Sequence, residues 1–84
     1  MTTEEFNARV LPHYKSMFRV AAALMGSSDA AADAVQDAML RLWDRRDRLA
    51  IVADIKTYCM NAVRNVCLNT IQRSKTGVAK VWVK

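Results

Sequence analysis

The chain has 84 residues, a hydrophobic content of 52% and a formal net charge of +5 at pH 7, which predicts one small globular domain and excludes a disordered chain. With two glycines, one proline and frequent Ala, Leu, Met and Arg, the sequence favours an all-α fold. No apolar run approaches the roughly 20 residues of a membrane span, and the N-terminus is unlike a signal peptide, so we expect a cytoplasmic protein.

The first predicted element is a broken helix over residues 2–25. Thr2 and Glu5 form a capping box at its start. Pro12 is expected to restart the helix, because proline suits a first turn and not an interior, and Gly26 to end it. The side chains that we expect to be buried along its second part are Tyr14, Met17, Phe18, Ala21 and Met25.

The second predicted helix begins after Ser27 or Ser28 and runs to about Arg48. At about 100° per residue it has two distinct faces. The apolar face contains Ala31, Val35, Ala38 and Leu42, and the polar face contains Asp33, Gln36, Asp37, Leu40 and Asp44. Leu40 is therefore surrounded by polar residues, on the side that the core does not reach. It is either an apolar anchor within a binding surface or an exposed leucine without a role, which is common on any protein.

A short connection over residues 49–53 leads to Asp54, the expected cap of a last helix from about Ile55 to Arg73. The predicted core stripe of this helix contains Ile55, Cys59, Ala62, Val63 and Val66.

The two cysteines, Cys59 and Cys67, lie eight residues apart on the last helix, too far along its axis to form a disulfide, so we expect reduced thiols. After Lys75 the pattern indicates either a stray strand or a frayed end. We therefore expect one domain over residues 1–75 and a short, poorly ordered tail over residues 76–84.

Charge is distributed unevenly along the chain. Residues 1–54 contain seven Lys/Arg and eight Asp/Glu, a net charge of −1, whereas residues 55–84 contain six Lys/Arg and no acid, a net charge of +6. The basic segment is either a binding surface for a polyanion or a solubilising tail.

The last helix also has an unusual polar face, with Asn61, Asn65 and Asn69 beside Arg64 and Gln72. Asparagine is a poor helix former, so its repetition needs a reason. Either the amides hydrogen-bond base edges, as in DNA-binding proteins, or they bond to neighbouring loops.

The sequence does not indicate an enzyme or a metal site. His13 is the only histidine, and no Ser/His or Cys/His arrangement falls at a useful spacing. Together with Cys59 and Cys67 it offers too few ligands for a closed zinc site. We expect no catalysis, cofactor or bound metal.

The stretch "DAVQDAMLRLWDRRDRL" followed by "IKTYCMNAVRNVCLNTIQRSK" resembles region 2 of bacterial sigma factors of the extracytoplasmic-function group. The positions that match the family pattern are Asp33, Gln36, Asp37, Leu42, Trp43, Asn65, Asn69 and Arg73. The first helix pair is similar too, with its break at Pro12, and the resemblance covers residues 6–75. It implies a small bundle of three to four helices.

The resemblance implies two binding surfaces. In this family the acid-and-glutamine helix docks on the clamp helices of the largest subunit of RNA polymerase, with Leu40 here as the apolar anchor. The matching polymerase-binding residues are Asp33, Gln36, Asp37, Leu40, Trp43 and Asp44. The loop over residues 48–54 and the last helix take up one base of the non-template strand of the minus-ten promoter element. The matching DNA-binding residues are Arg48, Lys56, Arg64, Asn65, Asn69, Arg73 and Lys75.

Within the DNA-binding set, Asn65 and Asn69 are the expected base readers, and the cations are expected to follow the DNA backbone.

The sequence departs from the family pattern in three ways. The loop lacks a glycine, Tyr58 stands where many members carry tryptophan, and nothing after Lys75 encodes the helix-turn-helix domain of whole members, so we expect a fragment or a truncated product. An anti-sigma factor is a further candidate partner. The alternative function is a helical interaction or duplex-DNA-binding module without sigma activity.

Overall fold

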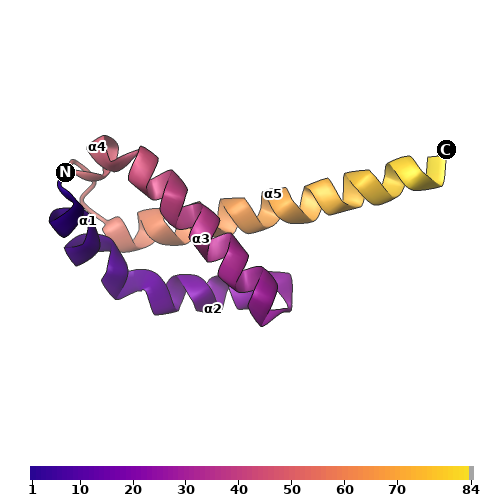
Figure 1. The fold of residues 1–84 in the computed structure, drawn as a ribbon, viewed down its shortest axis with the longest axis horizontal. Helices are drawn as coiled ribbons and strands as arrows, with labels where there is room; N and C mark the ends of the chain where they lie inside the picture. Colours follow the sequence, from indigo (N-terminus) through magenta and orange to yellow (C-terminus); the bar gives the residue numbers. More distant parts are fainter. Residues whose placement is uncertain (84) are drawn as a thin grey trace.

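The computed structural model describes the backbone of residues 1–83 and the side chains of residues 1–73. All regular elements in this part are helical, so the predicted all-α fold is confirmed (Figure 1). They are α1 (Thr3–Val10), a 3-10 turn η1 (Leu11–His13), α2 (Tyr14–Met25), α3 (Ser28–Asp44), α4 (Arg46–Leu49) and α5 (Ile55–Val83). No helix within the described residues is both long enough and apolar enough to cross a membrane.

The predicted helix starts and stops at the N-terminal end are confirmed. The Thr2 hydroxyl oxygen accepts from the backbone N–H of Glu5 at 3.2 Å and donates to the Glu5 carboxylate at 3.3 Å. Pro12 lies in η1, which separates α1 from α2. Gly26 ends α2 with a φ of 71°, a left-handed conformation that glycine adopts without strain. Ser27 then caps α3, since its hydroxyl oxygen accepts from the Ala30 N–H at 3.3 Å.

The predicted end of the second helix at Arg48 is wrong, because α3 ends at Asp44 and the chain turns at Arg45 into the short helix α4. The Arg46 guanidinium donates to the Trp43 carbonyl at 3.0 Å, which occupies an acceptor that a continuing helix would use. The turn also brings Leu49 into the core, where it is fully buried. Burying this leucine favours the break over a longer α3.

The core lies where α2, α3 and α5 pack on one another (Figure 1). The predicted apolar face of α3 is confirmed, since Ala31, Val35, Ala38 and Leu42 are all buried. The other buried side chains are Phe6, Val10, Met17, Ala21, Ala34, Leu49, Ile55, Cys59, Val63, Val66 and Cys67. Phe18, Met25 and Ala62, predicted as core, are partly buried. Tyr14 was expected in the same stripe and is instead 41% exposed, because it is the first residue of α2 and has no preceding turn of that helix beside it.

Cys59 and Cys67 are free thiols, as predicted, and both are buried. Burial disfavours the thiolate, so it raises the pKa of Cys59 to about 11 and also raises the pKa of Cys67. At neutral pH both side chains therefore behave as small hydrophobic groups in the core.

The backbone of α5 continues to Val83, beyond the predicted end at Arg73, so the strand that was one of the two expectations after Lys75 does not form. Figure 1 shows α5 extending past the other helices. The added stretch has no proline, and its one glycine, Gly77, costs a helix interior only about 1 kcal/mol. The expected poor order of residues 76–84 stays a prediction, and the side chain of Lys75 lies outside the described residues.

Candidate polymerase and nucleic-acid interfaces

The polar face of α3, formed by Asp33, Gln36, Asp37, Leu40 and Asp44, lies on the outside of the bundle as predicted. Leu40 is 66% exposed, and with Gln36 and Met39 it lines an open hollow of about 350 Å³. Exposing so much of a leucine gains nothing for folding. This face therefore offers an apolar centre surrounded by carboxylates and an amide.

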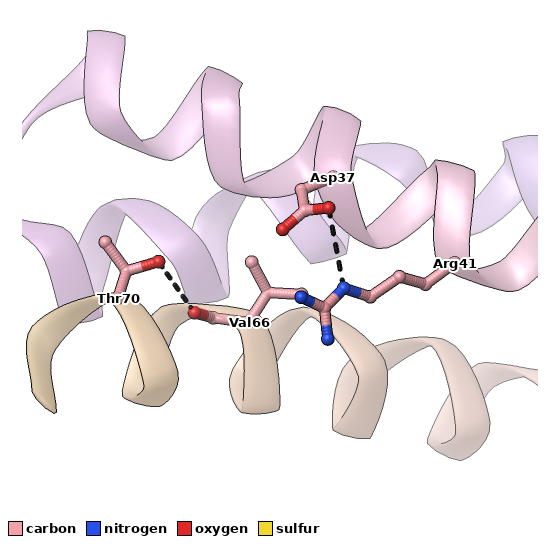
Figure 2. A network of polar contacts seen from close by, with 4 residues as sticks. All are labelled: Asp37, Arg41, Val66 and Thr70. Carbon is pink, nitrogen blue, oxygen red and sulfur yellow. Dashed lines mark hydrogen bonds and ion pairs between the residues drawn. The ribbon is translucent and has the colours of Figure 1, made fainter. Parts of the chain in front are cut away.

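Asp37 on this face forms an ion pair with a cation of the same helix. The Arg41 Nε lies 3.4 Å from Asp37 Oδ1, one helical turn away, and both side chains are about half exposed (Figure 2). An exposed pair of this kind contributes well under 1 kcal/mol. The Asp37 carboxylate is therefore oriented along the helix surface and is available to a stronger cationic partner.

Figure 2 also shows α5 directly beneath this pair, where the Thr70 hydroxyl donates to the Val66 carbonyl at 2.9 Å. The hydroxyl is thereby satisfied within α5. Above it, Asp33 and Asp37 line a smaller hollow of about 220 Å³ between α3 and α5, together with Met25, Val66 and Thr70.

Trp43 lies at the joint of α1, α3 and α4. Its ring meets the Phe6 ring edge-on at 5.1 Å, and the Arg46 guanidinium carbon lies 4.2 Å from the ring centroid. Both contacts are attractive and hold the joint together. The ring is only partly buried, and the role of Trp43 in polymerase binding stays a prediction.

The polar face of α5 is confirmed as an exposed surface. It lies opposite the buried side of the helix and consists of Asn61, Arg64, Asn65, Asn69, Gln72 and Arg73. Among the described side chains, the amides of the three asparagines make no hydrogen bond to a loop. The alternative that these amides serve to hold loops in place therefore loses its support. They remain available to a partner.

A hollow of about 350 Å³ separates the last turns of α3 from the first half of α5. We call it the α3–α5 pocket. Its lining residues are Arg41, Arg45, Tyr58, Asn61, Ala62 and Asn65. It combines two guanidinium groups, a phenol ring and two free amides, which are the groups that bind phosphates, stack on bases and read base edges, respectively.

Of the residues that line this pocket, the predicted DNA-binding set contains only Asn65. Arg41, in the last turn of α3, and Arg45, the residue that follows the helix, are four residues apart, a spacing that indicates one common side. No local pattern, however, shows that this side faces α5. Asn61 is among the amides of the predicted polar face but is not in the predicted DNA-binding set, and Tyr58 stands out in the sequence only as a departure from the family pattern.

The loop between α4 and α5 lies beside the first turn of α5. Asp54 caps that helix as predicted, accepting from the Thr57 N–H at 3.1 Å and from the Thr57 hydroxyl at 2.7 Å, and these bonds lower the pKa of Asp54. Ile51 is 86% exposed at the loop tip. Arg48 precedes Ile51 in the chain and Lys56 follows it. Both were predicted to bind DNA, and both side chains are exposed.

No cluster of three or more potential metal ligands occurs within the described residues. The described residues form two distinct surfaces: the polar face of α3, which is acidic with an apolar centre, and the surface around α5, which has amides, cations and an aromatic ring. Such an acidic face is complementary to a basic protein surface, and amides with cations are complementary to a nucleic acid.

Residues 10–76 match the family described as Sigma-70 region 2. No curated protein and no solved structure matches the chain. Because the matched segment covers well over half of the sequence, the chain belongs to the Sigma-70 region 2 family. Region 2 is a non-enzymatic part of sigma factors that acts in transcription initiation, where it interacts with the RNA polymerase core and promoter DNA.

Proposed function

We propose that this chain is region 2 of a sigma factor of the extracytoplasmic-function group. The polar face of α3 docks on the clamp helices of the largest RNA polymerase subunit. The loop over residues 48–54 and the polar face of α5 take up the non-template strand of the melted minus-ten element. The observation that carries this proposal is the α3–α5 pocket, which joins free amides to two guanidinium groups.

The polymerase assignment is supported by the surroundings of Leu40. A specific protein interface needs a desolvated apolar centre, and charges around it steer the encounter. Leu40 and Met39 supply apolar surface, while Asp33, Asp37 and Asp44 supply negative charge. This pattern fits a partner with basic side chains around an apolar depression.

The single-strand assignment is supported by size and chemistry. A pocket of about 350 Å³ is within the range of small-molecule sites and has room for a base. An amide can read the edge of a base only when the edge is exposed, and in a flipped or melted strand it is. The absence of any acid after Asp54 in the sequence favours a polyanion along the whole of α5.

The second candidate is a module that binds duplex DNA without sigma activity. The net charge of +6 over residues 55–84 favours this candidate as much as it favours single-strand binding.

The test compares the affinity for fluorescein-labelled single strands with that for the matching duplex, both of random sequence, in the presence and absence of RNA polymerase core. We expect single strands to bind more tightly, and core to increase this preference. Tighter binding of duplex, unchanged by core, would establish the second candidate instead.

A further inference from the structure

The loop between α4 and α5 is held by a residue from the far end of the sequence. The guanidinium of Arg9, on α1, donates to the carbonyl oxygen of Leu49 at 3.2 Å and to that of Val52 at 3.0 Å. The Val52 N–H closes the same turn by donating to the Leu49 oxygen at 3.2 Å. Arg9 therefore binds both ends of a single turn of the loop.

This double contact determines which side chain of the turn reaches solvent. Leu49 is fully buried and anchors the turn to the core, and Arg9 ties its two ends together. Ile51 lies between these ends and is 86% exposed, the largest exposure among the large hydrophobic side chains that the structure describes. The turn is held by three hydrogen bonds, yet it presents an isoleucine to water, which folding alone does not require.

We propose that Arg9 is a positioning residue for strand capture, because it holds the turn over residues 49–52 so that Ile51 packs against an unpaired base. The inference rests on the proposed function. Apolar side chains pack against bases that have left the stack, and they do so best when their backbone is already ordered. The exposed cations Arg48 and Lys56 lie nearby in the chain for the phosphates, while the nearby Asp54 is engaged with Thr57.

Arginine suits this position for a geometric reason. Its planar fork offers several N–H groups in fixed directions, so one side chain reaches two carbonyls. A lysine keeps the charge but has a single nitrogen. The helix α1 also has a separate apolar anchor, because Phe6 and Val10 are both buried, so we expect variants of Arg9 to fold.

The first arm of the test measures amide hydrogen exchange in Arg9→Gln, Arg9→Lys and the charge-matched control Arg19→Gln, whose exposed side chain lies on α2. We expect Arg9→Gln to speed exchange of the Val52 amide by about two- to tenfold, the range that the loss of a hydrogen bond gives. Arg9→Lys should have a smaller effect and Arg19→Gln none. The core amide of Val63 should be unaffected in all three, which separates positioning from general destabilisation. Unchanged Val52 exchange in Arg9→Gln would overturn the proposal.

The second arm uses fluorescein-labelled oligothymidine strands that differ in one central base. We expect Arg9→Gln and Ile51→Ser to reduce the ratio of affinities between strands with different central bases by similar factors. The double variant should show no larger reduction than either single variant. The salt dependence should stay unchanged in both, since neither residue contacts a phosphate. If Arg9→Gln kept its base preference while Ile51→Ser lost it, the role of Arg9 would be overturned and the proposed function would not. A wild-type chain that binds no strand, with or without polymerase core, would overturn the proposed function and this inference with it.

Discussion

Helices α3 and α5 are built on the same plan, with one buried apolar face and one exposed polar face, yet their polar faces differ in chemistry. The α3 face has carboxylates around Leu40, and Asp37 is paired with Arg41 on the same helix. The α5 face has amides and cations, and no acid follows Asp54. The first face is complementary to a basic protein surface and the second to a polyanion, although the two adjoin between α3 and α5, where Asp37 and Arg41 form their ion pair.

The contrast between buried and exposed leucines on α3 predicts the largest effect. Leu42→Ala should lower the free energy of unfolding by about 2–5 kcal/mol, because Leu42 is 1% exposed and its truncation leaves a cavity. Leu40→Ala, on the opposite face, is the matched control and should change it by less than about 0.5 kcal/mol. Urea denaturation of both variants provides the measurement. If both variants lowered the free energy of unfolding equally, Leu40 and Leu42 would not lie on an exposed and a buried face.

The second prediction concerns the α3 face alone. Leu40→Arg or Asp37→Lys should weaken binding to RNA polymerase core by about 2 kcal/mol or more, with little change in melting temperature, because neither side chain is part of the core. Asn65→Ala, on the α5 face, serves as the control and should bind core normally. Competition against a labelled sigma factor measures the affinity, and two variants that compete as well as wild type would refute the docking assignment.

The third prediction concerns base reading on the α5 face. Asn65→Ala and Asn69→Ala should each lose about 1–3 kcal/mol of discrimination between the preferred base and others, because an amide edge contact is removed. The salt dependence of binding should stay as in wild type. Titration of single strands with core present tests this. Full discrimination in both variants would move the base reader to the loop over residues 48–54.

The smallest effect is expected for the cations of the same face. Lys56→Ala, Arg64→Ala or Arg73→Ala should weaken binding to all single strands alike and lower the log–log salt slope by roughly 0.7 for each lost phosphate contact. Sequence preference should survive. Arg19→Ala removes the same charge from α2 and should leave the slope almost unchanged. A variant that keeps its slope does not contact a phosphate.

Much of this fold is predictable because its signals are local. The caps Thr2, Ser27 and Asp54 act within three residues of themselves, and the exposure of Leu40 follows from helical periodicity alone. The predicted core stripe does not include Cys67, which is fully buried, because α5 is covered over a wider arc than one stripe.

The features that could not be predicted depend on contacts between distant residues. The break at Arg45 follows from the burial of Leu49, and the turn of the loop is held by Arg9, which is 40 or more positions away in the chain. Likewise, the sequence contains Arg41 and Tyr58 but nothing that shows they line the same pocket. Only the packing of α3 on α5 brings these side chains together.

The spacing of the asparagines on α5 has a consequence for the register of a bound strand. Asn61, Asn65 and Asn69 recur every four residues, which is about 6 Å along the axis, and each step turns by about 40° around the helix. Consecutive nucleotides of a stacked strand advance by only about 3.4 Å. A strand that kept its stacking would therefore drift out of step with the amides within two nucleotides. One base for each asparagine is attainable only by a strand whose bases have been pulled apart along the helix.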